Sequence, residues 1–313
     1  MTTEHTDRDR PALSAAALTQ ALARPGGLWR AITVTAQTAS TNADLLAEAG
    51  GGAPEGLVLV ADAQTAGRGR LGRRWVSPPR AALMFSVLLR PSAVPAGRRG
   101  WLALLAGVAV VNGVRGSQEA RRLGPVKGTF SGTQPPQGHL HMPPPWGAAP
   151  QDPPWRDQGT AVAAAVDARL KWPNDVLVGD RKLAGILAEQ SGSAIVVGIG
   201  INVSTRRDEL PVPGATSLLV EGAARADRDL VLRGVLAEFE YWYQAWVADP
   251  GSGRLRGEYL RLCATLGRAV RVDLPGGRVI SGTASDVDPD GRLVVRTAAG
   301  PIAVSAGDVV HVR

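Results

Sequence analysis

The residues best suited to charge-driven chemistry in this 313-residue chain are its lysines, because only three of its 35 basic residues are lysine. Lys127 stands apart, whereas Lys171 and Lys182 lie in one short segment, residues 170–187. A lysine places a compact point charge on a flexible stem, which suits a moving phosphate or carboxylate oxygen better than a planar guanidinium does. The retained lysines therefore indicate either a charge that chemistry requires or a chance placement on the surface.

The second candidate is the segment Gly-Arg-Gly-Arg-Leu-Gly-Arg-Arg-Trp, residues 67–75. Its glycines let backbone N–H groups approach a ligand closely, and its arginines supply paired donors for phosphate or carboxylate oxygens. Its like charges predict a loop that is mobile when empty and ordered over an anion. No Gly-Lys-Ser/Thr follows, so it is not a nucleotide-binding P-loop. An arginine-glycine arm for the minor groove of A·T-rich DNA is the competing interpretation.

The third candidate is Lys-Trp-Pro-Asn-Asp, residues 171–175. The proline fixes the chain and pushes Trp172 into an extended geometry, and the Asn-Asp pair favours a tight turn before a strand. Lys171 is then held at a strand end on a stiff element, where a catalytic charge is well preorganised. An ordinary surface hairpin is the alternative interpretation.

Uncharged polar residues form two further groups. Ser40, Thr41 and Asn42 precede an apolar stretch, and Gln64 follows a buried strand. Their hydroxyls and amides suit a neutral polar ligand such as a ureido ring, although simple helix capping explains Ser40 and Thr41 equally well. Asn202 ends a strand whose glycines leave room for a ligand beside the sheet. The Asn202 side chain is suited to a hydrogen bond with a nucleotide base or ribose, or with neighbouring backbone.

The composition excludes several classes of function. With one cysteine, Cys263, the chain cannot form an internal disulfide, and four scattered histidines argue against Ser/Cys–His catalysis and a histidine-rich metal centre. A net charge of +7 permits an anionic partner but follows equally from arginine-biased codon usage. The first ten residues contain no apolar signal core, and no apolar run reaches membrane-spanning length. We therefore expect a cytoplasmic protein.

The elements that must position these residues can be predicted from apolar runs and capping signals. Strands are predicted at residues 28–34, 57–61, 82–89, 176–178 and 194–203, with the stretch 183–190 left unassigned between the last two. Helices are predicted at residues 14–22, 43–49, 101–114, 161–167, 230–247 and 254–264.

The chain divides into three predicted parts. Residues 1–27 form a tail with a short helix, residues 28–266 a catalytic domain, and residues 267–313 a small barrel. The barrel is predicted from five short strands, at residues 269–274, 279–285, 293–296, 302–304 and 309–312. Within the larger domain, residues 115–159 are crowded with proline and glycine and have no apolar periodicity, so we predict a disordered insertion there.

Taken together, five motifs stand in the order seen in bacterial biotin protein ligases, which this chain resembles from about residue 28 to its C-terminus apart from the insertion. They are Ser40-Thr-Asn42, Gln64 with residues 67–75, residues 171–175, residues 181–187 and residues 198–202. The resemblance implies an α+β fold with a catalytic domain akin to class II aminoacyl-tRNA synthetases and a C-terminal SH3-like barrel.

The resemblance also implies a two-step reaction. Biotin carboxylate attacks the α-phosphorus of ATP, which is bound with Mg²⁺, and gives biotinyl-5′-AMP and pyrophosphate. A lysine on the biotin carboxyl carrier domain of an acyl-CoA carboxylase then attacks the mixed anhydride. No covalent enzyme intermediate and no dedicated protein site for a metal ion are expected.

Site residues follow from the matched motifs. The resemblance implies that Lys171 and Arg70 are catalytic and that Lys171 bridges the biotin carboxylate and the α-phosphate. The residues expected to contact biotin are Ser40, Thr41, Asn42, Gln64, Arg68, Gly69, Arg70, Lys171 and Gly185. Those expected to contact ATP are Arg70, Arg73, Trp75, Lys171, Lys182 and Asn202.

Some ligases of this family begin with a DNA-binding winged helix, for which the 27 residues before the first predicted core strand are too few. We therefore expect no specific DNA binding, no membrane association, and a monomer or a weak homodimer linked to ligand binding. Two alternatives remain open. A lipoate-type protein ligase shares the architecture and the chemistry, and a basic DNA-binding protein could use the arginine-rich loop.

Overall fold

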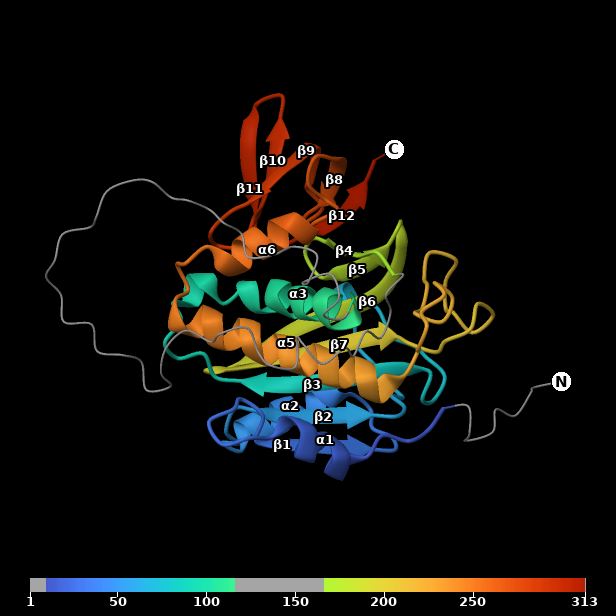
Figure 1. The fold of residues 1–313 in the computed structure, drawn as a ribbon. Helices are drawn as coiled ribbons and strands as arrows, with labels where there is room; N and C mark the ends of the chain where they lie inside the picture. Colours follow the sequence, from blue (N-terminus) through green and yellow to red (C-terminus); the bar gives the residue numbers. More distant parts are fainter. Residues whose placement is uncertain (1–9, 116–165, 313) are drawn as a thin grey trace, which may run out of the picture.

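Strand β3 (Ala82–Leu89) lies at the centre of the fold, and all of its side chains are buried. The computed structural model describes residues 10–115 and 166–312. Within them, β3 belongs to a seven-stranded sheet of order β1-β2-β3-β7-β6-β5-β4 (Figure 1). β1 (Ala31–Thr35) pairs parallel with β2 (Leu57–Ala61), and the other neighbours pair antiparallel. The remaining strands are β4 (Ala168–Lys171), β5 (Asp175–Val178), β6 (Arg181–Ser191) and β7 (Ala194–Asn202).

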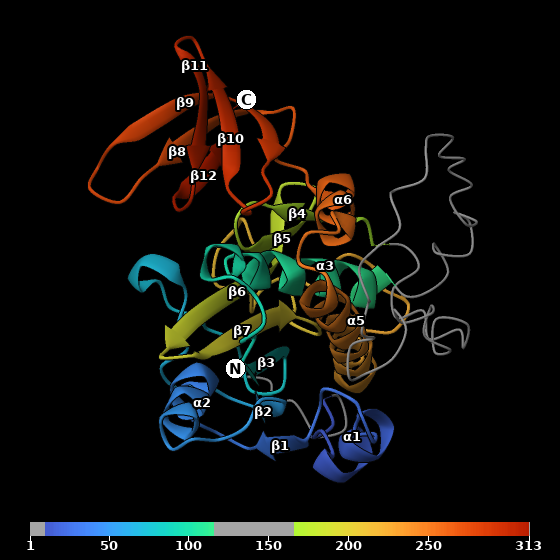
Figure 2. The same cartoon turned by 90° about the vertical axis from the view of Figure 1, so that its left-hand side faces the viewer.

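Helices cover the two faces of this sheet unequally (Figure 2). Four of them enclose the main hydrophobic core on one side: α1 (Ala15–Leu22), α3 (Trp101–Arg115), α5 (Arg228–Ala248) and α6 (Arg254–Leu262). On the other side, α2 (Thr41–Gly50) packs Leu45 and Ala49 on Leu88 and Val196 in a smaller core. Because α2 covers only part of its face, the rest is open to loops and to a cavity. None of the helices in the described part of the chain is long and apolar enough to cross a membrane.

The C-terminal part forms a second sheet, which is five-stranded and antiparallel with the order β11-β10-β9-β8-β12. Its core is supplied by alternating apolar residues such as Val270, Val272 and Val295. The expected α+β class is thereby confirmed, with one mixed sheet and a small antiparallel one. The strands are β8 (Ala269–Asp273), β9 (Val279–Val287), β10 (Leu293–Thr297), β11 (Gly300–Val304) and β12 (Asp308–His311).

Two tryptophans fasten the small sheet to the large one. The indole N–H of Trp101 donates to the carbonyl of Pro289 at 2.8 Å, and that of Trp172 donates to the carbonyl of Gly291 at 3.0 Å. Both acceptors lie in the turn between β9 and β10. Both indole rings are buried, so each bond satisfies a donor that burial would otherwise leave unpaired. The two sheets therefore meet at a fixed point.

The predicted elements were largely found, with several exceptions. Strand β1 begins three residues later than predicted, and β4 and β6 were not predicted at all. Most of the helix predicted at residues 161–167 lies outside the described residues, and its last two residues are not helical. The predicted insertion also lies outside them, except that Arg115 is buried at the end of α3 and donates to Asp167 and to the Ala168 carbonyl. The predicted domain boundaries stay predictions.

Candidate active site

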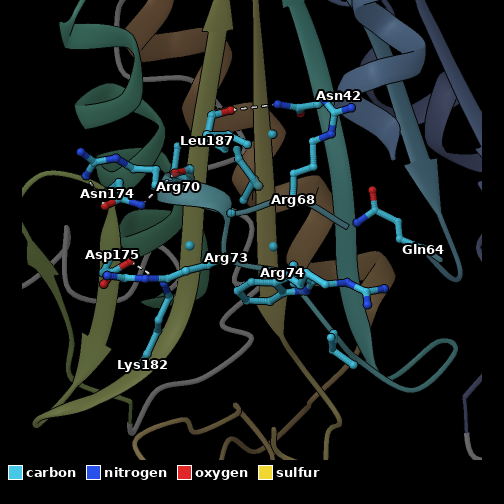
Figure 3. Close-up of a pocket in the computed structure, with 18 of the residues that line it drawn as sticks. Asn42, Gln64, Arg68, Arg70, Arg73, Arg74, Asn174, Asp175, Lys182 and Leu187 are labelled. Carbon is cyan, nitrogen blue, oxygen red and sulfur yellow. Dashed lines mark hydrogen bonds and ion pairs between the residues drawn. The ribbon is translucent and has the colours of Figure 1, made fainter. Parts of the chain in front are cut away.

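A cavity of about 340 Å³ opens on the α2 face of the large sheet (Figure 3). Its walls are the N-terminus of α2, strands β6 and β7, and residues 67–75, which we call the arginine loop. This loop contains one short helical turn, and its internal backbone bonds join Trp75 to Gly67 and Gly69 to Arg73. The arginine loop therefore has a defined shape over the cavity.

Uncharged polar groups gather at the α2 end of the cavity. Gln64 accepts hydrogen bonds from the backbone N–H of Thr41 at 2.8 Å and from its hydroxyl at 3.2 Å. The hydroxyl of Ser86, which is fully buried on β3, lies 2.7 Å from the Thr41 hydroxyl and 2.6 Å from the side-chain amide oxygen of Asn42. Since its oxygen is occupied, Gln64 presents its amide N–H₂ to the cavity (Figure 3). Ser40 caps α2 by accepting from the Ala43 N–H.

Glycines on β6 and β7 shape the floor of the cavity. A Cβ at Gly200 would lie 2.6 Å from the Trp75 ring, and one at Gly198 would lie 2.1 Å from the Asn42 side chain. Gly185, which belongs to β6, lies against the same ring. Because β7 side chains alternate between faces, the apolar residues next to these glycines, Val197, Ile199 and Ile201, belong to the main core. The glycines thus admit Trp75 and Asn42 to the sheet surface.

Charged groups gather at the opposite end. Lys182 Nζ lies 2.6 Å from a carboxylate oxygen of Asp175. The Arg70 guanidinium donates to Asn174 at 2.9 Å and to the Gly307 carbonyl of the small sheet at 3.2 Å. Burial lowers the pKa of Arg70, although an arginine so placed stays charged at neutral pH. Arg73 pairs with Asp308, whose hydrogen bond raises the pKa of Arg73.

The charge around the cavity is predominantly positive. Five cationic side chains line it, against the two carboxylates of Asp175 and Asp308. Such a surface attracts an anion with several charges, since guanidinium and ammonium donors exchange their weak internal partners for phosphate oxygens. The cationic residues are Arg68, Arg70, Arg73, Arg74 and Lys182.

Lys171 is not among the residues that line this cavity, and its predicted role as the site's bridging charge stays a prediction. Lys171 ends β4 directly opposite Asp175, which does line the cavity, and cross-strand partners lie on the same face of a sheet. The charge of Lys171 also acts on His311 of β12: burial and then Lys171 lower the pKa of His311 to about 4. Lys182, eleven positions along the chain, lines the cavity itself.

The other predicted site residues do come together. All of them line the cavity: Ser40, Thr41, Asn42, Gln64, Arg68, Gly69, Arg70, Arg73, Trp75, Lys182, Gly185 and Asn202. Asn202 is buried, and its side-chain amide donates to the backbone carbonyl of Thr216 at 2.9 Å. It therefore borders the cavity and also satisfies neighbouring backbone. The Trp75 indole N–H is buried without a partner in the described part of the chain.

Sequence reasoning missed several cavity residues. Asn174 and Asp175 belong to a recognised motif but were predicted only to form a turn, and Asp308, just before the last predicted strand, was assigned no role. Nothing local marks Asp308, because it comes from the small sheet and reaches the arginine loop across more than 200 residues. Pro211, Val212 and Ala215 come from the segment between β7 and α5, which carries no periodic signal.

Known proteins resemble this chain over most of its length. Residues 34–205 match the model of the biotin/lipoate A/B protein ligase family, and residues 265–312 match the biotin protein ligase C-terminal domain. The biotin–[acetyl-CoA-carboxylase] ligase of Mycobacterium tuberculosis is 40% identical over 98% of this chain and 100% of its own length. The bifunctional ligase/repressor BirA of Bacillus subtilis is 28% identical over 82% of this chain and 66% of its own length.

Solved structures extend the similarity to the fold. The biotin protein ligase of Aquifex aeolicus in complex with biotin and ATP superposes with a TM-score of 0.64 at 25% identity. The match covers 90% of this chain and 98% of that one. Matches of this extent, to both sheets and to the whole length of a relative, show that the chain belongs to the biotin protein ligases, which are ligase enzymes of the biotin/lipoate protein ligase family.

Proposed function

We propose that the cavity activates biotin with ATP and then passes it to a lysine of a biotin carboxyl carrier domain. In the first step the biotin carboxylate attacks the α-phosphorus, so that biotinyl-5′-AMP forms and pyrophosphate leaves. In the second, the lysine amine attacks the anhydride carbonyl, and AMP leaves as an amide forms. The observation that carries this proposal is the 40% identity, over the whole chain, to an enzyme named for this ligation.

The uncharged end of the cavity is assigned to biotin. Gln64 and Thr41 offer a fixed amide and hydroxyl for the ureido group, because Ser86 and the α2 backbone hold them in place. Arg68 and Gly69 of the arginine loop would close over the same end. The remaining residues assigned to this end are Ser40, Asn42 and Gly185, all of which border the cavity.

The cationic end is assigned to the reacting carboxylate and the phosphates. Lys171, opposite Asp175 at the end of β4, is proposed to bridge the biotin carboxylate and the α-phosphate. Lys182, whose ammonium lies at the cavity and is oriented by Asp175, is proposed to contact the nucleotide. Arg70 and Arg73 would neutralise the charge that develops on the α-phosphate and on pyrophosphate. Trp75, whose ring packs against Gly185 and Gly200, and Asn202 are assigned to the nucleotide.

Magnesium is proposed to arrive with the nucleotide. In the described residues no three acidic, histidine or cysteine side chains lie close enough to hold a metal ion. The two cavity carboxylates, Asp175 and Asp308, are paired with Lys182 and Arg73. This donor set fits an ion held mainly by phosphate oxygens and water, which is the usual state of Mg²⁺ at nucleotides.

The acceptor, cellular location and assembly are proposals of the same kind. The carrier domain of an acyl-CoA carboxylase is proposed as acceptor because the 40% identical relative is named for acetyl-CoA carboxylase. We further propose a cytoplasmic protein, a monomer or weak ligand-linked homodimer, and no sequence-specific DNA binding. The match to the ligase/repressor of Bacillus subtilis spans 66% of that protein. A gel shift of the present protein with the operator DNA of that repressor, at physiological salt, tests for sequence-specific DNA binding.

A direct assay tests the function. The purified chain is incubated with ATP, Mg²⁺ and labelled biotin, with and without a carrier domain, and pyrophosphate and labelled protein are measured. We expect pyrophosphate release that depends on biotin, and label on the carrier lysine only when the carrier is present. Lipoate in place of biotin should give little product. Equal activity with lipoate, or no biotin-dependent release, would refute the proposal.

A further inference from the structure

Strand β6 carries a charged residue near each of its two ends. Lys182 lies near its start, and Glu189 lies seven residues further on, next to the end assigned to biotin. At the usual rise of a strand these positions are about 23 Å apart. This separation exceeds the screening length of about 8 Å at physiological salt, so the Glu189 charge has little direct effect on the phosphates.

Glu189 joins two elements that do not otherwise share a side chain bond in the described residues. One carboxylate oxygen accepts a hydrogen bond from the Asn42 amide at 2.7 Å. The other lies 3.6 Å from the Arg68 guanidinium of the arginine loop. Asn42 also donates to the Leu187 carbonyl at 3.2 Å, which sets the position of its amide on β6. Glu189 therefore connects the arginine loop to the first turn of α2.

At this end the arginine loop is otherwise held by its own backbone bonds and by the Arg74 guanidinium, which donates to the Thr65 carbonyl at 2.8 Å. A second cavity of about 570 Å³ lies beneath it, lined by residues 66–74 together with Leu187 and Glu189. At the loop tip, Leu71 is 67% exposed and adopts a left-handed backbone conformation (φ 55°). The opposite end of the loop is held by Arg70 to Asn174 and by Arg73 to Asp308. The Arg68–Glu189 pair spans the open side.

We propose that Glu189 is a positioning residue that holds the arginine loop closed over biotin and thereby sets how long biotin and its adenylate stay bound. It acts through Arg68 and Asn42 and does not touch the reacting atoms. The proposal rests on the function proposed above, because it concerns the same cavity. It assigns to Glu189 the retention of ligand, whereas Lys182 and the loop arginines at the far end act on the phosphates.

The test uses Glu189→Gln, which keeps the acceptor for Asn42 but removes the charge that attracts Arg68. The ion pair is partly exposed, with 28% of the Glu189 side chain and 54% of the Arg68 side chain accessible. Its removal should therefore have a modest effect on ligand release. We expect the biotinyl adenylate to dissociate about two- to fivefold faster and the KM for biotin to rise similarly. Adenylate formation at saturating biotin and ATP should change by less than about twofold.

The salt dependence of adenylate release distinguishes a charge pair between Glu189 and Arg68 from a merely structural role of Glu189. In the wild type, rising ionic strength weakens the Arg68–Glu189 pair, so adenylate release should accelerate. In Glu189→Gln this acceleration should be smaller. The matched control is Asp229→Asn, which removes a carboxylate paired with Arg233 on α5, away from the cavity. It should leave both the release rate and its salt dependence unchanged.

A double-mutant cycle with Arg68→Gln tests the route of action. If Glu189 acts through Arg68, Glu189→Gln should add little to the release rate of Arg68→Gln. Equal effects of Glu189→Gln in both backgrounds, or unchanged release in the single variant, would overturn the proposal. Should Glu189→Gln melt at a lower temperature than the wild type, Arg68→Gln alone still tests the pair through the loss of salt dependence. Failure of the wild type to form any adenylate would instead refute the proposed function.

Discussion

At the residue scale, the shape of the site depends on glycines, which lack a side chain, as much as on the side chains that line it. Gly198 and Gly200 interrupt an otherwise apolar strand, and each leaves space that another side chain fills. The sequence indicated that these glycines made room beside the sheet. It did not indicate what filled that room, because Asn42 and Trp75 come from distant parts of the chain.

Replacing Gly200 by alanine should displace the Trp75 ring, since the added carbon would lie 2.6 Å from it. We expect the KM for ATP to rise by about tenfold and stability to fall by about 1–3 kcal/mol, as in other overpacked sites. The control is Gly257→Ala on the exposed face of α6, where an added carbon meets nothing within 4 Å. That variant should be about 0.5–1 kcal/mol more stable than the wild type. An unchanged KM in Gly200→Ala would show that Trp75 does not serve the nucleotide.

His311 predicts a pH dependence of stability. Arg268 lies 3.3 Å from Nδ1 and, as a donor, requires an unprotonated nitrogen there, while Nε2 faces the Thr265 hydroxyl at 3.2 Å. Burial, with Lys171 and Arg268 close by and Asp180 opposing, lowers the pKa of His311 to about 4. In the unfolded chain the pKa is about 6.5. Between these values only the unfolded chain binds the proton, so the free energy of unfolding falls as pH falls.

The expected loss from pH 6.5 to pH 4 is about 1–2 kcal/mol, because the imidazole is only half-buried and solvent screens its neighbours. Urea unfolding of the wild type and of His311→Gln across this range measures it. Carboxylates titrate in both proteins, so the difference between the two curves isolates His311. Parallel curves would contradict the assignment.

At the scale of elements, what was predictable from sequence depended on how uniform each element is. Strands β2 and β3 were found with their observed bounds because they are continuous apolar runs flanked by turn residues. Strand β6 was missed because one of its faces borders the two cavities and carries Lys182, Gly185 and Glu189 in place of apolar residues. A strand that lines a cavity therefore lacks the apolar pattern by which β2 and β3 were recognised.

The positions of Lys171 and Lys182 depend on the same kind of long-range information. Both lysines belong to one antiparallel unit, β4–β5–β6, and without its register neither could be assigned to a face. A bulge between Val176 and Leu177 shifts the pairing of β5 with β6 and sets where Lys182 points. Neither the bulge nor the register has a signal in the local sequence, so composition alone could not assign either lysine to a face of the sheet.

A buried ion pair ties α5 to the end of β2, near Gln64. Asp62 accepts from Arg228 at 2.8 Å and from Arg80 at 2.9 Å, and both Asp62 and Arg228 are 5% exposed. Asp62→Asn should lower the free energy of unfolding by about 3–5 kcal/mol, because it leaves the guanidinium of Arg228 buried without a counter-charge. Urea denaturation measures this change. The double variant Asp62→Asn/Arg228→Met should recover part of the loss, and a double variant less stable than Asp62→Asn would contradict the explanation.

At the scale of the whole molecule, the two sheets meet around the cavity as well as at the tryptophan contacts. The small sheet contributes the Gly307 carbonyl and the Asp308 carboxylate, which hold Arg70 and Arg73. The small sheet was predicted from sequence, but its contribution to the site was not. The contact joins residues that are far apart in the chain and that become neighbours only when the fold is complete.

Asp308→Asn tests this contribution. The loss of charge weakens the link to Arg73 and leaves the cationic end of the arginine loop less ordered. We expect the KM for ATP to rise about two- to fivefold, whereas the KM for biotin should stay within about twofold. Steady-state kinetics with each substrate varied in turn separate the two effects. A lower KM for ATP would show that Asp308 competes with the phosphates and does not position the loop.

The central claim is that the ammonium of Lys171 stabilises the reacting carboxylate and phosphate. Single-turnover release of pyrophosphate, with biotin and ATP saturating, compares Lys171→Ala with the wild type most directly. Removal of one preorganised donor costs about 10²–10³ in rate, so Lys171→Ala should lose at least about 10²-fold while it keeps its fold. A near-wild-type rate in Lys171→Ala would contradict this account.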